Sequence, residues 1–362
     1  MSTLVNAGAS FPALCFGKLP ACADYLRHNA SGRDVLAFDQ WLQQGLFHAR
    51  TELREEWRAS YDASPSYHFL FFPENSESFL LGVVKASQDR SERRYPFIVS
   101  LRVDRRFPPT LIPLAPVIFA SFLEGARQLV EHASEGMSVQ EVTDASDQLQ
   151  TPVERSYDTA RHAYGEHLAS TSASRMFERL WGAPEDERVL LTFKNLLDVL
   201  LPLRGRNAAR LAPGLRFPLL TTRPELQYTT SFWLDAAFIL TRASSSRPFA
   251  FWTATSEVTS HVVAANGNGS GAMPHHASQA HLFLFLREPS SRSVLHLLRP
   301  DINSDVICEV DVDGIEQIVR ARASLPSSLA RALVTEDTKL RALLDMLASP
   351  RVHAAANQES RC

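Results

Sequence analysis

Cysteine is scarce in this sequence, and the few cysteines lie far apart. None of the four forms a CxxC pair; they are Cys15, Cys22, Cys308 and Cys362. Small secreted domains depend on dense disulfides, whereas a chain of 362 residues can build a hydrophobic core without them. We therefore expect no disulfide framework and a reducing, cytoplasmic location.

An excess of positive charge is also missing. The chain has 37 Lys and Arg against 40 Asp and Glu, which gives a formal net charge of -3. A nucleic-acid-binding domain usually carries a basic patch and a high pI. The composition therefore predicts no nucleic-acid partner.

Long apolar runs are absent as well. The first ten residues, MSTLVNAGAS, lack the basic and apolar regions of a secretory signal. The most apolar long segment, residues 114–130, includes Glu124 and Arg127 and is typical of an amphipathic helix. Because a span needs roughly 18 apolar residues, we expect no direct membrane insertion.

Catalytic signatures are missing from the sequence. It contains no GxSxG elbow, and the glycine-rich stretch 267–276, GNGSGAMPHH, has Ala-Met-Pro where a phosphate loop needs Lys and Ser or Thr. His275, His276 and His281 lack an HExxH spacing or a carboxylate partner at a helical step. We predict a surface loop at 267–276, structural or solvated histidines, no metal, no cofactor and no intrinsic catalysis.

The apolar pattern that is present predicts an α+β fold. Apolar residues at three- and four-residue steps predict a helix over 34–58, and a second helix is expected over 114–130. Short polar connections join three aromatic and β-branched runs, which predicts antiparallel strands over 67–72, 79–85 and 95–103. We expect these strands to be adjacent in one sheet under the first helix, with Trp41 and Leu46 buried.

The remaining chain predicts a helical connector and a second α+β region. Short helices are expected near 139, with a Ser138–Glu141 capping box, and over 154–168 and 174–181. A strong helix follows over 187–203, and a terminal helix is expected near 335–347. Five apolar runs between them have β character: 231–240, 247–254, 281–288, 293–300 and 305–312. Because 362 residues favour two domains, we divide the chain into domains 1–135 and 188–350, a connector 136–187 and a flexible tail 351–362.

Four sequence elements in the first domain resemble the TagF family, the ImpM-like accessory proteins of bacterial type VI secretion systems. Their family pattern reads GKLPxxGDFVxR, WxxWLQxGL, SPxWRF and PSxDRxGRxFPL. This chain reads GKLPACADYLR, WLQQGLFHAR, YDASPSYHF and ASQDRSERRYPF in the same order. The resemblance covers residues 14 to 103, and residues 215 to 300 look more loosely like the second half of longer relatives.

Most motif positions match, and some depart. The matches are Gly17, Lys18, Leu19, Pro20, Asp24, Arg27, Trp41, Leu42, Gln43, Gly45, Leu46, Ser64, Pro65, Phe69, Ser87, Asp89, Arg90, Arg93 and Pro96. The departures are Tyr25, Leu26, Tyr67, His68, Ala23, Ala86 and Glu92, of which Ala23 and Glu92 replace family glycines. If those glycines adopt a positive φ, the local turns must differ here.

The resemblance implies a regulator rather than an enzyme. TagF-like proteins are implicated as negative post-translational regulators that act in the cytoplasm on type VI secretion components, in some systems by binding a forkhead-associated scaffold protein. We therefore expect a non-enzymatic regulatory binding protein. Two alternatives stay open: an enzyme that uses Asp24 and Asp89 as an acid-base pair in a cleft, and a structural adaptor of the baseplate or membrane complex.

The opening GKLP segment is interpreted as a rigid corner. Gly17 and Pro20 would set its turn, Leu19 and Tyr25 would pack inward, and Asp24 would accept hydrogen bonds from Arg90 or Arg93. The same segments carry more cations than anions, so we expect an acidic or phosphorylated partner. The predicted binding residues are Lys18, Arg27, Arg90, Arg93 and Arg94, and the predicted structural residues are Gly17, Leu19, Pro20, Asp24, Tyr25, Trp41, Gly45, Ser64, Pro65, Ser87, Asp89 and Pro96.

Overall fold

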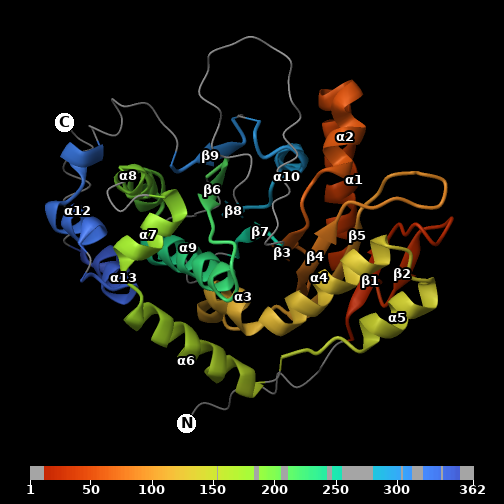
Figure 1. Cartoon of the computed structure of the whole chain (residues 1–362), viewed down its shortest axis with the longest axis horizontal. Coiled ribbons are helices and arrows are strands. Elements are labelled where there is room, and N and C mark those ends of the chain that lie inside the picture. Colours follow the sequence, from red (N-terminus) through yellow and green to blue (C-terminus); the bar gives the residue numbers. More distant parts are fainter. Residues whose placement is uncertain are drawn as a thin grey trace.

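The computed structural model describes residues 12–152, 154–182, 187–204, 211–242, 247–254, 280–302, 305–311, 321–335 and 337–350. Across this part of the chain, one nine-stranded sheet lies between two layers of helices, in the order β2-β1-β5-β4-β3-β7-β8-β6-β9 (Figure 1). Neighbouring strands pair antiparallel except β6 and β9. The predicted α+β class with a mainly antiparallel sheet is confirmed.

The strands are short and mostly buried. Their bounds are β1 Leu14–Gly17, β2 Leu26–His28, β3 Tyr67–Phe71, β4 Ser78–Lys85, β5 Phe97–Asp104, β6 Gly214–Pro218, β7 Phe249–Thr253, β8 His281–Phe285 and β9 Ile307–Glu309. The three strands predicted in the first domain are β3, β4 and β5, and they pair consecutively as an antiparallel meander. β1 and β2 were not predicted, because both are too short to show an alternating pattern.

The sheet runs across the predicted domain boundary. β3 pairs with β7 in a register that sets Phe69 opposite Phe251 and Leu70 opposite Ala250. The two predicted α+β regions therefore share one sheet and one hydrophobic core. The predicted domain boundaries at residues 135 and 187 stay a prediction. The helices of the predicted connector follow the strands of the first half and precede those of the second half along the chain.

Helices cover both faces of the sheet. Those of the first half are α1 Arg33–Leu53, η1 Arg54–Glu56, α2 Trp57–Asp62, η2 Pro109–Leu114, α3 Ala115–Ile118 and α4 Ala120–Ser134. The connector holds α5 Val139–Asp147, α6 Glu154–Ser170 and α7 Ala173–Trp181. Those of the second half are α8 Arg188–Leu200, η3 Leu201–Leu203, α9 Glu225–Thr241, η5 Ser291–Ser293, α10 Val294–Leu298, α12 Ser327–Val334 and α13 Leu340–Ala348.

Helix α1 joins the two halves of the sheet from one side. The Trp41 ring is buried and stacks on Phe251 of β7 with centroids 5.1 Å apart, while its Nε1 donates to the Pro289 carbonyl at 2.9 Å. The Phe38 ring stacks on Phe69 of β3 at 4.6 Å. Leu46 is also buried. The predicted packing of this helix over the sheet is confirmed.

Gly45 allows α10 to approach α1 closely. A Cβ atom at this position would lie 2.2 Å from Cγ2 of Val294 and 2.7 Å from the carbonyl oxygen of Ser291. Both distances are far below van der Waals contact. A glycine is therefore needed where α1 crosses η5 and α10.

The opposite face of the sheet is covered by α4 and, over the second half, by α9. Trp233 of α9 stacks on Phe217 of β6 at 5.1 Å and donates from Nε1 to the Pro218 carbonyl at 2.9 Å. On the first half, the Phe79 ring of β4 contacts Phe107 at 6.0 Å, ahead of η2. These contacts place large aromatic rings in both halves of the core.

Two predicted strands are helices. The run 231–240 lies inside α9, and the run 293–300 contains the end of η5 and all of α10. α9 is buried on nearly all sides, since it packs between the sheet and other helices. A helix that is apolar all round shows no amphipathic period, and for that reason it resembled a buried strand.

Most predicted helices are confirmed. α1, α4, α6, α7, α8 and α13 correspond to the predicted segments, and Ser138 and Glu141 form the predicted capping box at the start of α5. His281 is buried at the start of β8. The glycine-rich stretch 267–276 with His275 and His276, and the tail 351–362, lie outside the described residues.

Among the described helices, none alone has the length and apolar composition to cross a membrane. The segments Pro109–Ile118 and Ala120–Ser134 meet that criterion only as a pair, with a bend of 52° between them.

Candidate functional site

The family-like segments meet at one end of the sheet. We call residues 17–27 the corner and residues 87–96 the turn. β1 ends at Gly17, which pairs with Phe97 at the start of β5. Because β1 and β5 are antiparallel, the corner that follows β1 and the turn that precedes β5 come together. The prediction that these two segments meet is therefore correct.

Gly17 is needed at this junction for two reasons. Its φ is +127°, a conformation that side chains disfavour. A Cβ atom would also lie 2.1 Å from the Pro96 carbonyl oxygen. Leu19 next to it is fully buried, as predicted. The backbone at Gly17 and the buried Leu19 side chain therefore fix the start of the corner against β5.

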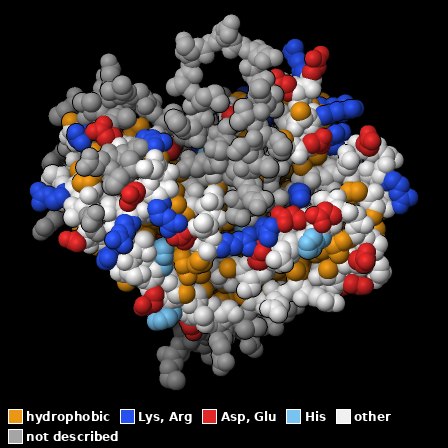
Figure 2. All heavy atoms as spheres, in the orientation of Figure 1, with side chains coloured by type: hydrophobic (Ala, Val, Ile, Leu, Met, Phe, Trp, Pro, Cys, Tyr) orange, Lys and Arg blue, Asp and Glu red, His pale blue; other side chains and the backbone are white. Residues whose placement is uncertain are grey.

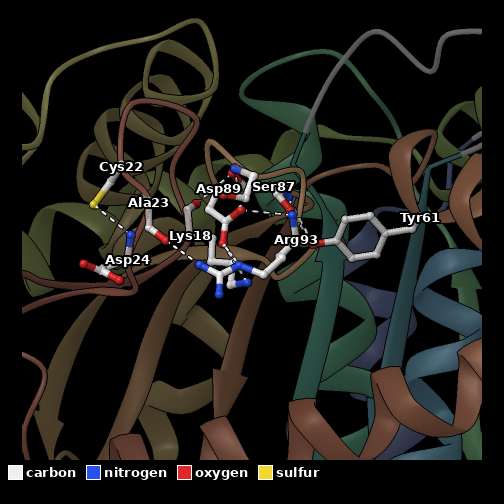
Figure 3. A network of polar contacts seen from close by, with 9 residues as sticks. Lys18, Cys22, Ala23, Asp24, Tyr61, Ser87, Asp89 and Arg93 are labelled. Carbon is white, nitrogen blue, oxygen red and sulfur yellow. Dashed lines mark hydrogen bonds and ion pairs between the residues drawn. The ribbon is translucent and has the colours of Figure 1, made fainter.

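Asp89 is the centre of the site. Its side chain is buried, and its Oδ2 lies 3.0 Å from Nζ of Lys18 and 2.7 Å from Nε of Arg93 (Figure 3). Its Oδ1 accepts from the backbone N–H groups of Ser91 and Arg93, at 2.9 and 3.0 Å. Burial raises the pKa of this carboxyl, but the hydrogen bonds from Lys18 and Arg93 outweigh it and hold the pKa well below its usual range.

Two arginines of the turn hold the corner through its backbone. The Arg90 guanidinium donates to the Ala21 carbonyl, and the Arg93 guanidinium donates to the Ala23 carbonyl. The backbone N–H of Arg90 also donates to the Cys22 carbonyl at 2.9 Å. The loops are thus pinned together by donor groups of the turn and acceptor groups of the corner.

Asp24 does not make the predicted contact. It is exposed, and its own backbone N–H donates to Sγ of Cys22 at 3.3 Å. Figure 3 shows its carboxylate pointing away from Arg93. The prediction that Asp24 binds Arg90 or Arg93 is therefore wrong, because Asp89 and two backbone carbonyls already occupy those guanidiniums.

Ser87 connects the turn to α2. Its Oγ donates to the Lys18 carbonyl at 2.8 Å, and its own carbonyl accepts from the Tyr61 hydroxyl at 2.9 Å. Tyr61 is buried, and Ser64 beside it donates from Oγ to the Tyr61 carbonyl at 2.8 Å. Ser64 therefore caps the end of α2, the helix whose Tyr61 binds the turn.

A second buried carboxylate, Asp39 of α1, holds the other end of the corner. The hydroxyls of Tyr25 and Tyr95 both donate to its Oδ1, and Arg27 donates to its Oδ2 at 3.1 Å. The rings of Tyr25 and Tyr95 lie 5.4 Å apart. Burial, followed by the Asp39 charge, raises the pKa of Tyr25, so this hydroxyl stays protonated as a donor.

The five predicted binding residues are not equally available. Lys18 and Arg94 have only 17% of their side chains exposed, since Lys18 pairs with Asp89 and Arg94 forms a two-pronged pair with Asp62 of α2. Arg93 and Arg27 are 61% and 50% exposed, and Arg90 is exposed. Of the five, these last three have exposed side chains.

The predicted surplus of positive charge is also wrong. The structure adds Asp39 and Asp62 to this region, so the five cations face five carboxylates: Asp24, Asp39, Asp62, Asp89 and Glu92. Formal charge is therefore balanced. On the face that Figure 2 shows, basic and acidic side chains are also interspersed.

Glu92 explains one departure from the family pattern. Its φ is +60°, so the turn keeps the left-handed residue that a glycine would supply. The hydrogen bond from Glu92 N to the Asp89 carbonyl, at 2.9 Å, closes the turn. Ala23 is absent from the described non-glycine residues with positive φ, so its replacement of a glycine needs no strained backbone.

A small apolar cavity of about 30 Å³ lies beneath α1 and beside Pro65 and Pro96, with Trp41 and Tyr61 in its wall. That volume is enough for about two or three water molecules. It does not contain Asp24 or Asp89. The described residues also contain no group of three or more His, Cys, Asp or Glu side chains placed to hold a metal ion.

Asp39, Tyr61 and Asp62 belong to the site but were not predicted from the sequence. Asp39 lies on the buried face of α1 beside Phe38 and Leu42, where a charged residue requires partners. An acidic residue at a buried helix position was therefore the sequence feature that could have identified Asp39 as part of the site. Nothing in the local sequence indicated that Tyr61 would reach Ser87.

Comparisons with known proteins identify the N-terminal part of the chain. Residues 15–149 match the family model of the TagF N-terminal domain, described as type VI secretion system-associated. The crystal structure of PA0076 from Pseudomonas aeruginosa PAO1 is similar at 21% sequence identity and a TM-score of 0.36, over 42% of this chain and 77% of that chain. The comparison with curated proteins found no match. Residues 15–149 of this chain therefore form a TagF N-terminal domain, of the kind associated with the type VI secretion system.

Proposed function

We propose that this protein is a non-enzymatic regulator that represses assembly or firing of the secretion system by binding one of its cytoplasmic components. The TagF N-terminal domain carries this proposal, because it links the chain to the type VI apparatus. A forkhead-associated scaffold protein is the partner that the family resemblance favours. The site adds a rigid surface on which such a partner can dock.

The binding surface that we propose is the corner rim, defined as Asp24, Arg90, Glu92 and Arg93. All four side chains are exposed at the junction of the corner and the turn. Asp89 accepts from the backbone N–H groups of Glu92 and Arg93, and Cys22 accepts from those of Arg90 and Asp24. Preformed surfaces of this kind lose little conformational entropy on binding.

The contacts of Asp89 favour binding over catalysis. A general acid or base must exchange a proton with a substrate, but both oxygens of Asp89 are occupied by charged or backbone donors. Asp24 is exposed and lies outside the cavity. We therefore propose structural and docking roles for the two residues, with no turnover.

The test is a double charge inversion, Asp24→Arg with Glu92→Arg. Neither carboxylate accepts a hydrogen bond or forms an ion pair among the described residues, so the fold should persist. We expect the variant to lose the scaffold in a pull-down and to secrete more tube protein than wild type. The matched control is Asp337→Arg with Asp345→Arg, two exposed acids near the C-terminal helix α13. A folded corner variant that still binds the scaffold and still represses secretion sinks the proposed surface.

A further inference from the structure

The outer face of α1 lacks charge over four turns. Between Arg33 and Arg50, five side chains of this helix are exposed, and none is ionisable; they are Leu36, Gln40, Gln43, Gln44 and Phe47. Two of them are large and apolar, with Leu36 49% and Phe47 75% exposed. Charge depletion around an aromatic residue is typical of the centre of a protein interface.

The order of side chains along this face is a palindrome. With the flanking arginines, six positions read Arg33, Leu36, Gln40, Gln43, Phe47 and Arg50, which is basic, apolar, amide, amide, apolar, basic. The positions are symmetric about a point between residues 41 and 42. Their spacing also keeps them within one stripe of an α-helix, since each residue turns by about 100°.

A palindromic stripe is complementary to itself under a two-fold axis. If two copies of α1 pack antiparallel across that point, Leu36 of one copy lies opposite Phe47 of the other, and Gln40 lies opposite Gln43. Each contact then occurs twice, as in an isologous dimer. We propose that this protein self-associates through the α1 stripe, and that its occupant is a second copy of the same chain.

The flanking residues predict how tight this dimer is. The same register sets Arg33 opposite Arg50 at both ends, and neither arginine forms an ion pair with the described residues of its own chain. Like charges oppose association, and a contact over about four helical turns is smaller than a standard interface. The dimer is therefore weak, and added salt strengthens it by screening the arginines.

The test is sedimentation of the full chain over a wide range of concentrations. Wild type should pass from monomer to dimer as concentration rises. Phe47→Glu should remain monomeric while it keeps the wild-type melting temperature, because the Phe47 side chain is 75% exposed and packs on little in its own chain. Val334→Glu, at an apolar residue of α12 that is 48% exposed, is the matched control and should dimerise like wild type.

A variant that should tighten the dimer distinguishes the proposed contact from a loss of folding. Arg50→Glu places a carboxylate opposite Arg33 at each end of the stripe, so two attractions replace two repulsions. The dimer should tighten by about 2- to 30-fold. The prediction is wrong if Arg50→Glu and wild type stay monomeric at every concentration. It is equally wrong if Phe47→Glu dimerises like wild type.

The antiparallel register has its own test, in a background with Cys22, Cys308 and Cys362 changed to Ser. Arg33→Cys and Arg50→Cys proteins are mixed and treated with a short thiol cross-linker. Mixed pairs should cross-link, whereas like pairs, about 26 Å apart along the helices, should not. Equal cross-linking within each single variant would contradict this register. This surface is distinct from the corner rim, so its failure leaves the proposed function standing.

Discussion

At the residue scale, the site depends on one buried carboxylate and the donors around it. Asp89→Asn removes the charge that faces Lys18 and Arg93, and places an amide N–H₂ where two cations now donate. We expect a loss of about 2 kcal/mol in the free energy of unfolding. Urea titration of the variant against wild type measures it, with the exposed Asp24→Asn as the matched control that should change little.

The pKa of Asp89 predicts a pH dependence with a definite sign. Because the folded protein holds this pKa below the usual value of 3.8, the folded state stabilises the ionised form. That contribution is complete above pH about 4 and is lost as pH falls below it. The stability of Asp89→Asn should therefore fall less steeply with acid than that of wild type. Parallel pH profiles for the two proteins would contradict this assignment.

A substitution at Glu92 is predicted to raise the free energy of unfolding. Its φ of +60° is unfavourable for a residue with a side chain. Glu92→Gly should raise the free energy of unfolding by about 0.5–1 kcal/mol. Ser91→Gly, at a neighbour without a positive φ, should not raise it. A lower melting temperature for Glu92→Gly than for wild type would show that its side chain has a structural role.

At the scale of elements, α1 packs on both halves of the shared sheet. Trp41 contacts Phe38 on its own helix, Phe71 on β3 and Phe251 on β7. Trp41→Ala should therefore cost about 3–5 kcal/mol. Thermal unfolding measures the loss, and Phe47→Ala on the exposed face of the same helix is the control. A cost below about 1 kcal/mol would mean that α1 is not central to packing.

The same scale shows what the sequence could predict. α1 was predictable because it buries one face and so shows an amphipathic period. β3 to β5 were predictable because polar turns separate their aromatic runs. α9 failed because it is buried on nearly all sides, and β1 and β2 because they have only four and three residues. The corner–turn contact was predictable from the motifs. The partners of Arg27 and Arg94 were not, because Asp39 and Asp62 lie 12 and 32 residues from them in sequence.

At the scale of the whole molecule, the shared sheet makes the two predicted domains interdependent. Residues 12–149 alone would expose the β7-facing edge of β3 and the rings that contact Phe251. Exposed, apolar edge strands promote aggregation. We expect this fragment to be insoluble or to melt without cooperativity, while the full chain melts in one transition. A soluble, cooperatively folded fragment would support the division into two domains instead.

The corner rim gives the molecule its proposed link to the secretion system, and one measurement tests that link most directly. Wild type and the Asp24→Arg, Glu92→Arg variant, each tagged at native levels, are purified from the native cell and their partners quantified by mass spectrometry. Our account predicts that type VI components are enriched with wild type and lost with the variant, while the Asp337→Arg, Asp345→Arg control retains them. Equal recovery of those components by all three proteins would contradict it.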